Sequence, residues 1–128
     1  MQHAINWFEI PVTDMARAIK FYQTLTGRAV RREAYGPPGE EMAVFEAPDS
    51  EGSTGALLYS PNAQPAAQGT LIYLNAGQNV QACLDRVGAA GGSIVIGKTA
   101  LPPGMGYFAH IIDSEGNKVG LHGEATAP

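Results

Sequence analysis

Two ionisable side chains near opposite ends of this 128-residue sequence, Glu9 and His122, are the first candidates for chemistry. A carboxylate and an imidazole that share an apolar pocket can transfer protons as an acid–base pair. Each side chain also has a structural alternative. Glu9 lies near the end of a predicted strand and could pair with an arginine, while His122 lies close to the C-terminus and could hold a structural hydrogen bond. Proton transfer therefore requires a fold that brings the two together.

The other histidines and the single cysteine favour structural roles. His110 alternates with Ala109 and Ile111, which favours packing or surface exposure, and His3 is expected to be an exposed terminal residue. Cys83 falls on the apolar face of a predicted helix, where burial disfavours a reactive thiolate. We therefore expect neither a cysteine nucleophile nor an intrachain disulfide.

The charge pattern argues against several classes of partner. The formal net charge is −4, and the eight Lys and Arg residues are scattered apart from one cluster at Arg28, Arg31 and Arg32. A nucleic-acid partner would need a concentrated basic face, so none is expected. No apolar run approaches the roughly 18 residues of a membrane span, and the N-terminus lacks the pattern of a signal peptide. With a single cysteine, these features predict a cytoplasmic protein with no membrane partner.

The tetrapeptide DSEG occurs twice, at 49–52 and at 113–116, so that the copies lie 64 residues apart. Chance is one explanation, because these residue types are common in turns. The surrounding pattern favours duplication, since each half contains a strand, a helix and three further strands. A proline pair precedes the third strand of each half, and DSEG precedes the last one. The sequence thus predicts two copies of a βαβββ unit.

Local signals set the bounds of these elements. Thr13 or Asp14 can cap the first helix, Gly27 can end it, and Asn79 can cap the second. Apolar residues recur at helical spacing on both helices, namely Met15, Ala18, Ile19 and Tyr22 on the first and Val80, Cys83, Leu84 and Val87 on the second. The predicted strands span 4–12, 29–35, 41–47, 54–60, 69–76, 93–100, 106–113 and 118–124.

Two segments resemble the vicinal oxygen chelate superfamily, which includes glyoxalase I, extradiol dioxygenases and the bleomycin- and fosfomycin-resistance proteins. The first is WFEIPVTDMARAIKFYQTLTG at 7–27, and the second is YFAHIIDSEGNKVGLHG at 107–123. The resemblance implies an α+β fold, in which two tandem βαβββ modules form curved mixed sheets that enclose a cleft, with the helices outside.

The same resemblance implies one domain over 1–128, with module one at about 4–60 and module two at about 69–124. Members of the superfamily often dimerise, and in some of them modules of two chains build the cleft. A homodimer is therefore expected here.

Metal-using members of the superfamily hold a divalent ion with four His, Glu or Gln side chains. The resemblance places these positions at Trp7, Leu71, Gly120 and either Ala56 or Leu57. None of these side chains can donate to a metal ion. A shift of two residues offers only Glu9 and His122 as ligands, because it brings in Tyr73 and Leu58 at the other positions. We therefore expect no metal and no other cofactor.

Strand periodicity predicts which residues line the cleft. If Trp7 faces the cleft, so does Glu9, while Phe8 and Ile10 pack under the helices. By the same rule Leu74 and Leu121 belong to the core. Gly120 would leave space for a ligand, and Tyr107 is placed on a loop at the cleft rim. The predicted ligand-binding residues are Trp7, Tyr73, Asn75, Tyr107 and Gly120, and the predicted catalytic residues are Glu9 and His122.

These features predict a protein that binds a small organic molecule in a metal-free cleft. Lyase- or isomerase-like turnover by Glu9 and His122 would be an addition to that binding. Two alternatives stay open: ligand or antibiotic sequestration without turnover, and a metal-dependent lyase, similar to lactoylglutathione lyase, or a dioxygenase. The sequence identifies no substrate.

Overall fold

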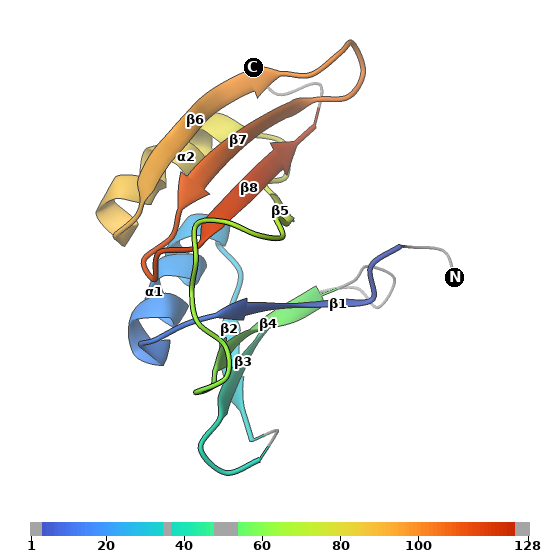
Figure 1. Ribbon diagram of the computed structural model, residues 1–128. Coiled ribbons are helices and arrows are strands. Elements are labelled where there is room, and N and C mark those ends of the chain that lie inside the picture. Colours follow the sequence, from blue (N-terminus) through green and yellow to red (C-terminus); the bar gives the residue numbers. More distant parts are fainter. Residues whose placement is uncertain (1–3, 35–36, 48–53, 125–128) are drawn as a thin grey trace.

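The computed structural model describes residues 4–34, 37–47 and 54–124. The first DSEG copy and His3 lie outside these ranges. Figure 1 shows two sheets stacked along the long axis of the molecule, each with one helix.

Each half of the chain forms one four-stranded mixed sheet. The first module contains β1 (Trp7–Pro11), α1 (Met15–Thr26), β2 (Val30–Glu33), β3 (Glu41–Phe45) and β4 (Thr54–Tyr59). The second contains β5 (Tyr73–Asn75), α2 (Val80–Ala90), β6 (Ser93–Ala100), β7 (Tyr107–Ile112) and β8 (Lys118–Gly123). All ten elements expected from the sequence are therefore present.

The two modules share one topology, with strand orders β1-β4-β3-β2 and β5-β8-β7-β6. In each of them the first strand pairs in parallel with the last strand. Glu9 lies opposite Ala56 in the first module, and Tyr73 lies opposite Gly120 in the second. Both residues of the second pair follow those of the first by the 64 residues that separate the DSEG copies. The predicted α+β fold with tandem βαβββ modules is confirmed.

The helix ends follow the predicted caps. Asp14, rather than Thr13, is the N-cap of α1, and its side chain accepts a hydrogen bond from the Arg17 backbone N–H at 3.0 Å. Gly27 ends α1 at φ 72°, a left-handed conformation that glycine adopts without a steric penalty. Asn79 caps α2 in the same way as Asp14 caps α1.

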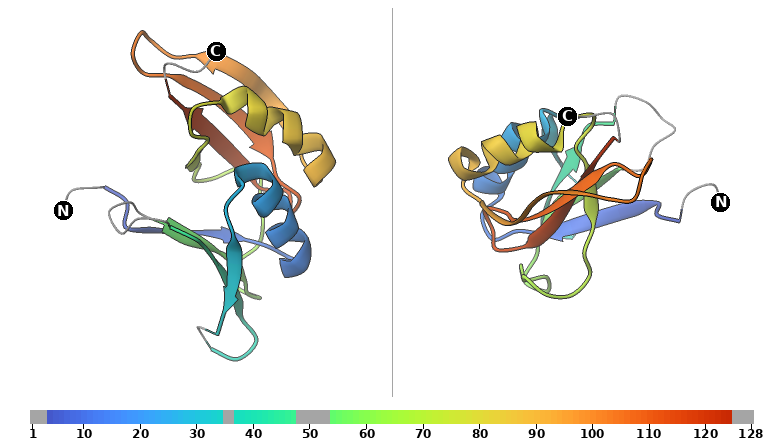
Figure 2. Two further views of the ribbon diagram at one scale, coloured as in Figure 1. Left: turned by 180° about the vertical axis from the view of Figure 1, so that it is seen from behind. Right: turned by 90° about the horizontal axis from the view of Figure 1, so that it is seen from above.

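A core forms where the helices cover the sheets. Figure 2 shows both helices on the same side of the molecule, leaving the opposite face of each sheet uncovered. All the residues predicted for the apolar stripes are buried, except Ile19, which is half-buried. Fully burying a large apolar side chain contributes about 1.5–3 kcal/mol, so these stripes fix the helices on the sheets.

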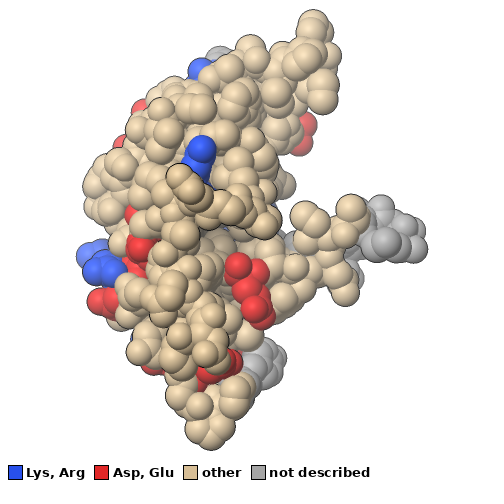
Figure 3. All heavy atoms as spheres, in the orientation of Figure 1, with Lys and Arg blue, Asp and Glu red and all other residues tan. Residues whose placement is uncertain are grey.

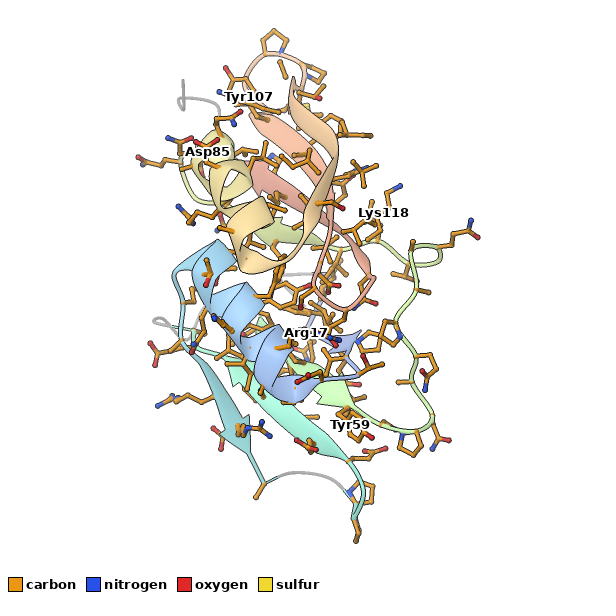
Figure 4. The ribbon with its side chains drawn as sticks, turned by 90° about the vertical axis from the view of Figure 1, so that its left-hand side faces the viewer. Arg17, Tyr59, Asp85, Tyr107 and Lys118 are labelled. Carbon is orange, nitrogen blue, oxygen red and sulfur yellow. The ribbon has the colours of Figure 1, made fainter. Side chains whose placement is uncertain are left out.

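The second DSEG turn binds the first helix and so joins the modules (Figure 4 labels Arg17 at this junction). Glu115 accepts hydrogen bonds from the backbone N–H groups of Thr13 and Asp14, each at 2.9 Å, and from Arg17 Nε at 2.6 Å. Burial alone would raise the pKa of Glu115, but these bonds outweigh it and lower the pKa to about 2. In the same turn, the Asp113 carboxylate accepts a bond from the buried Tyr22 hydroxyl at 2.6 Å.

Across the described segments, neither helix has the length and apolar character needed to cross a membrane.

Candidate functional site

The molecule is hollowed between its two modules, and the hollow opens at the right-hand side in Figure 3. At its base lies a pocket of about 210 Å³. Residues of β1, of β8 and of the connection 61–72 line this pocket, and Glu9 and Lys118 bring charges of opposite sign to it. We call the face of each sheet opposite the helices the cleft face.

The first module contributes Trp7 and Glu9 to its cleft face. Both side chains are exposed, and Trp7 Nε1 donates a hydrogen bond to Glu9 Oε2 at 3.3 Å. The residues between and after them point to the helices, since Phe8 is half-buried against Phe45 and Ile10 is buried. The predicted alternation of faces along β1 is therefore confirmed.

The second module places Tyr73, Gly120 and His110 in one row across β5, β8 and β7. Strands in a sheet lie about 4.8 Å apart, so Tyr73 and His110 belong to backbones about 10 Å apart. They nevertheless meet, with 2.7 Å between Tyr73 Oη and His110 Nε2. A Cβ atom on residue 120 would overlap the Tyr73 ring. The ring thus lies across β8 and reaches His110 because Gly120 has no side chain.

The surroundings of His110 are largely apolar. Its ring lies 5.4 Å from that of Phe108, centroid to centroid, and its Nδ1 atom is buried without a hydrogen-bond partner among the described residues. Burial lowers the pKa of His110, and the positive charge of Lys118 lowers it further. Both effects favour the neutral form of the imidazole.

His122 and Asn75 lie opposite each other at the far ends of β8 and β5. His122 is exposed and its Nε2 lies 2.8 Å from the backbone oxygen of Met105, while the Asn75 side chain accepts a bond from the backbone of Gly77 at 2.7 Å. Glu9 bonds instead to Trp7. Within the described chain, the predicted catalytic residues Glu9 and His122 share no hydrogen bond and have separate partners.

Two expectations about position are wrong. Tyr107 is not on a loop at the cleft rim: it starts β7 on the face it shares with Ala109 and Ile111, where it packs against the core (Figure 4). The Lys98 ammonium lies 4.3 Å from the centre of the Tyr107 ring. Gly120 does not leave open space for a ligand either, because the Tyr73 ring covers it.

His110, for which a packing or surface role was predicted, lies on the cleft face beside Tyr73. Its alternation with Ala109 and Ile111 was the correct signal, because those two residues are fully buried and His110 must point the other way. The DSEG turn then fixes the antiparallel register that sets His110 opposite Gly120. Combining that register with the predicted cleft position of Gly120 would have placed His110 in the site.

The donor set at the positions implied for metal ligands does not fit a divalent ion. A divalent ion needs several oxygen or imidazole nitrogen donors that converge at about 2.0–2.2 Å. No such donor is present in the side chains at these positions, which are Trp7, Ala56, Leu71 and Gly120. In the part of the chain that the structure describes, no three His, Cys, Asp or Glu side chains gather as a metal site.

The family of the protein follows from a sequence match that covers almost the whole chain. Residues 4–121 match the model of the Glyoxalase/Bleomycin resistance protein/Dioxygenase superfamily. The chain belongs to this superfamily. A "Glyoxylase-like domain-containing protein" from Didymella fabae is 30% identical over 125 residues, which cover 97% of this chain and 94% of that protein.

Solved structures agree on the fold of this superfamily member. The trypanothione-dependent glyoxalase I of Leishmania major matches with a TM-score of 0.70 at 18% identity, covering 98% of this chain and 89% of that one. TnmS3, an antibiotic binding protein from Streptomyces sp. CB03234, matches with a TM-score of 0.60 at 20% identity over 97% and 98% of the two chains. At these identities the matches establish the fold alone.

Proposed function

We propose that this superfamily member binds a small, flat organic molecule in the cleft between its modules without using a metal ion. The observation that carries the proposal is the set of side chains on the cleft face. Trp7 is 42% exposed and Tyr73 49% exposed, so the cleft faces of the two modules each present a large aromatic ring to a ligand. Aromatic walls with a few polar groups suit a planar ligand.

Binding without turnover is the form of this function that we favour. Proton transfer requires the two groups to reach one substrate at hydrogen-bond distance, and Glu9 and His122 bond instead to Trp7 and Met105. TnmS3 provides a precedent on this fold, since it is an antibiotic binding protein. A protein of this type would sequester its ligand, and we expect it to do so in the cytoplasm.

The first experiment measures what the purified protein carries. We expect native mass spectrometry of protein purified without chelators to detect a bound organic molecule, and elemental analysis to find far less than one metal ion per chain. A stoichiometric divalent ion would contradict the proposal and support metal-dependent lyase or dioxygenase chemistry.

The second experiment uses Trp7, the only tryptophan in the chain, as a reporter of the cleft. Titration with 2-ethylnaphthalene, a flat apolar probe, should quench its fluorescence to saturation. An unchanged Trp7 emission with every flat probe tested would contradict an aromatic-binding cleft.

Acid–base catalysis by Glu9 and His122 is the competing proposal. Glu9→Gln and His122→Ala would lower turnover of the cleft ligand by about 10²–10⁴ if these residues transfer protons. Under sequestration the same variants change only the affinity. Product formation by the wild-type protein, lost in both variants, would establish catalysis.

We also propose a homodimer, with β6 as its contact. Ile94, Val95 and Ile96 are 51%, 50% and 38% exposed, and β6 is the edge strand of its sheet in the described chain. Two copies of this edge can pair in antiparallel fashion about Val95, which brings each Ile94 opposite an Ile96 and does not oppose the two Lys98 charges. A second copy therefore fits this surface better than a charged partner does.

A further inference from the structure

The hydrogen bond between Tyr73 and His110 indicates which kind of ligand atom the cleft can bind. Its hydrogen bond can be formed in two ways, because a neutral imidazole carries one proton on either nitrogen. In one form the Tyr73 hydroxyl donates to His110 Nε2, and the imidazole proton is then on Nδ1. In the other form His110 Nε2–H donates to the Tyr73 oxygen, and Nδ1 is an unprotonated acceptor.

The environment of Nδ1 distinguishes these two forms. This atom is buried and has no hydrogen-bond partner in the described chain. A buried N–H without a partner is rarer and costlier than a buried acceptor without one. The form with the proton on Nε2 avoids the buried N–H, which favours His110 as the donor and Tyr73 as the acceptor of their bond.

This assignment leaves the proton of the Tyr73 hydroxyl free. With the oxygen accepting from His110 at 2.7 Å, the half-exposed side chain has its own O–H available for a ligand in the cleft. Lys118 adds a positive charge that is close enough to His110 to lower its pKa. Both features favour a ligand atom that accepts hydrogen bonds over one that donates them.

We propose that Tyr73 is a hydrogen-bond donor that recognises a carbonyl or phenolate oxygen of a planar aromatic ligand, and that His110 is the positioning residue that orients its hydroxyl. The inference rests on the proposed function, since it adds the chemical class of the ligand to the same cleft. The pair is specific to the second module: the matching row of the first contains Glu9, Ala56 and Val44.

A matched pair of probes tests the recognition step. 2-Acetylnaphthalene and 2-ethylnaphthalene have nearly the same shape, and only the former carries a carbonyl oxygen. We expect the ketone to quench Trp7 fluorescence with a dissociation constant about three- to tenfold lower, the effect of one neutral hydrogen bond. Tyr73→Phe should abolish this preference, so that the two dissociation constants become equal.

Two further variants separate recognition from general packing. His110→Phe keeps an aromatic ring but removes the donor, so the ketone preference should fall while 2-ethylnaphthalene still binds. Tyr59→Phe is the control, because Tyr59 is an exposed tyrosine of the first module on the helix-side face of β4 (Figure 4), and its removal should change neither affinity.

The tautomer is tested without any ligand. Nitrogen-15 NMR of the wild-type protein should show His110 protonated on Nε2 with Nδ1 bare, and Tyr73→Phe should perturb the Nε2 signal. A proton on Nδ1 would overturn the inference even if both probes bind. Equal affinity of the wild-type protein for the two probes would also overturn it, while the proposed function would stand. Failure of both probes to bind would contradict the proposed function and the inference with it.

Discussion

The two modules have the same topology but carry different side chains at equivalent positions. In the middle of the first cleft face, a row crosses β1, β4 and β3 with Glu9, Ala56 and Val44. The equivalent row of the second crosses β5, β8 and β7 with Tyr73, Gly120 and His110. The first row offers a single carboxylate, that of Glu9. In the second row, Tyr73 and His110 form a hydrogen bond across Gly120. A duplicated scaffold thus holds two different chemistries, because the backbone pairing is retained while the cleft-facing residues vary.

The outer edges of the sheets differ in the same manner. The edge strand β2 carries Arg31 and Arg32, which pair with Glu46 at 3.5 Å and Glu41 at 2.6 Å. The edge strand β6 instead exposes three consecutive apolar residues. Charged side chains on an edge discourage pairing with another chain, and apolar ones permit it. The first module is therefore protected at its edge, and the second is available for association.

The largest expected effect concerns the turn that joins the modules. Glu115→Ala removes the acceptor for two backbone N–H groups of the α1 N-terminus and for Arg17. We expect the free energy of unfolding to fall by about 2–3 kcal/mol, after allowing for solvent screening of the half-exposed Arg17. Urea unfolding measures it. Glu41→Ala, which breaks an exposed pair, is the matched control and should cost less than about 1 kcal/mol.

The same residue predicts a pH dependence. Its folded pKa of about 2 lies below the ordinary value of 4.5, so the unfolded chain binds the proton more tightly. The stabilisation from Glu115 is therefore complete above pH 4.5 and is lost as the pH falls toward 2. The glutamine of Glu115→Gln does not titrate. The difference in free energy of unfolding between this variant and the wild-type protein should therefore become smaller as the pH falls from 4.5 toward 2. A gap that stays constant would show that the carboxylate is not the stabilising group.

The second comparison tests two glycines that each support a close contact. A methyl group at Gly55 would overlap the backbone oxygen and ring of Phe8, which cannot move away easily. Gly55→Ala should therefore cost about 1–3 kcal/mol of unfolding free energy. Gly120→Ala should cost less, because the half-exposed Tyr73 ring can swing into the cleft, but it should separate Tyr73 from His110. A change in the His110 nitrogen signals without a large loss of stability would support this contrast. Equal destabilisation with unchanged His110 signals would contradict it.

The smallest expected effect concerns the two edges. Ile94→Lys should raise the dissociation constant of the homodimer by about tenfold or more, because a charge replaces buried apolar surface. Arg31→Ala, on the equivalent edge of the first module, should leave the dissociation constant of the homodimer unchanged. Sedimentation velocity over a concentration series measures both. A wild-type protein that stays monomeric at every concentration would contradict the proposed dimer.

Much of the fold followed from local spacing. The caps at Asp14 and Asn79 and the left-handed Gly27 depend on neighbouring residues, and each was predicted within one position. Strand faces were equally predictable where buried residues alternate, as Ile10 and Leu74 do with their neighbours. Tyr107 was misplaced because the prolines and glycines of 102–106 were given more weight than the predicted strand 106–113, which contains it.

The sequence by itself determined the order of elements, the duplication, the helix ends and the absence of donor side chains at the implied metal positions, because these depend on residue type and short-range periodicity. Only the tertiary structure decided which cleft residues meet. Tyr73 and His110 lie on strands that are not neighbours, and their contact depends on the register of two strand pairs and on the missing side chain of Gly120 between them. Glu9 and His122 share the cleft face, but their sheets give them separate partners. Contacts of this kind depend on the register and packing of whole sheets, which no single segment of the sequence specifies.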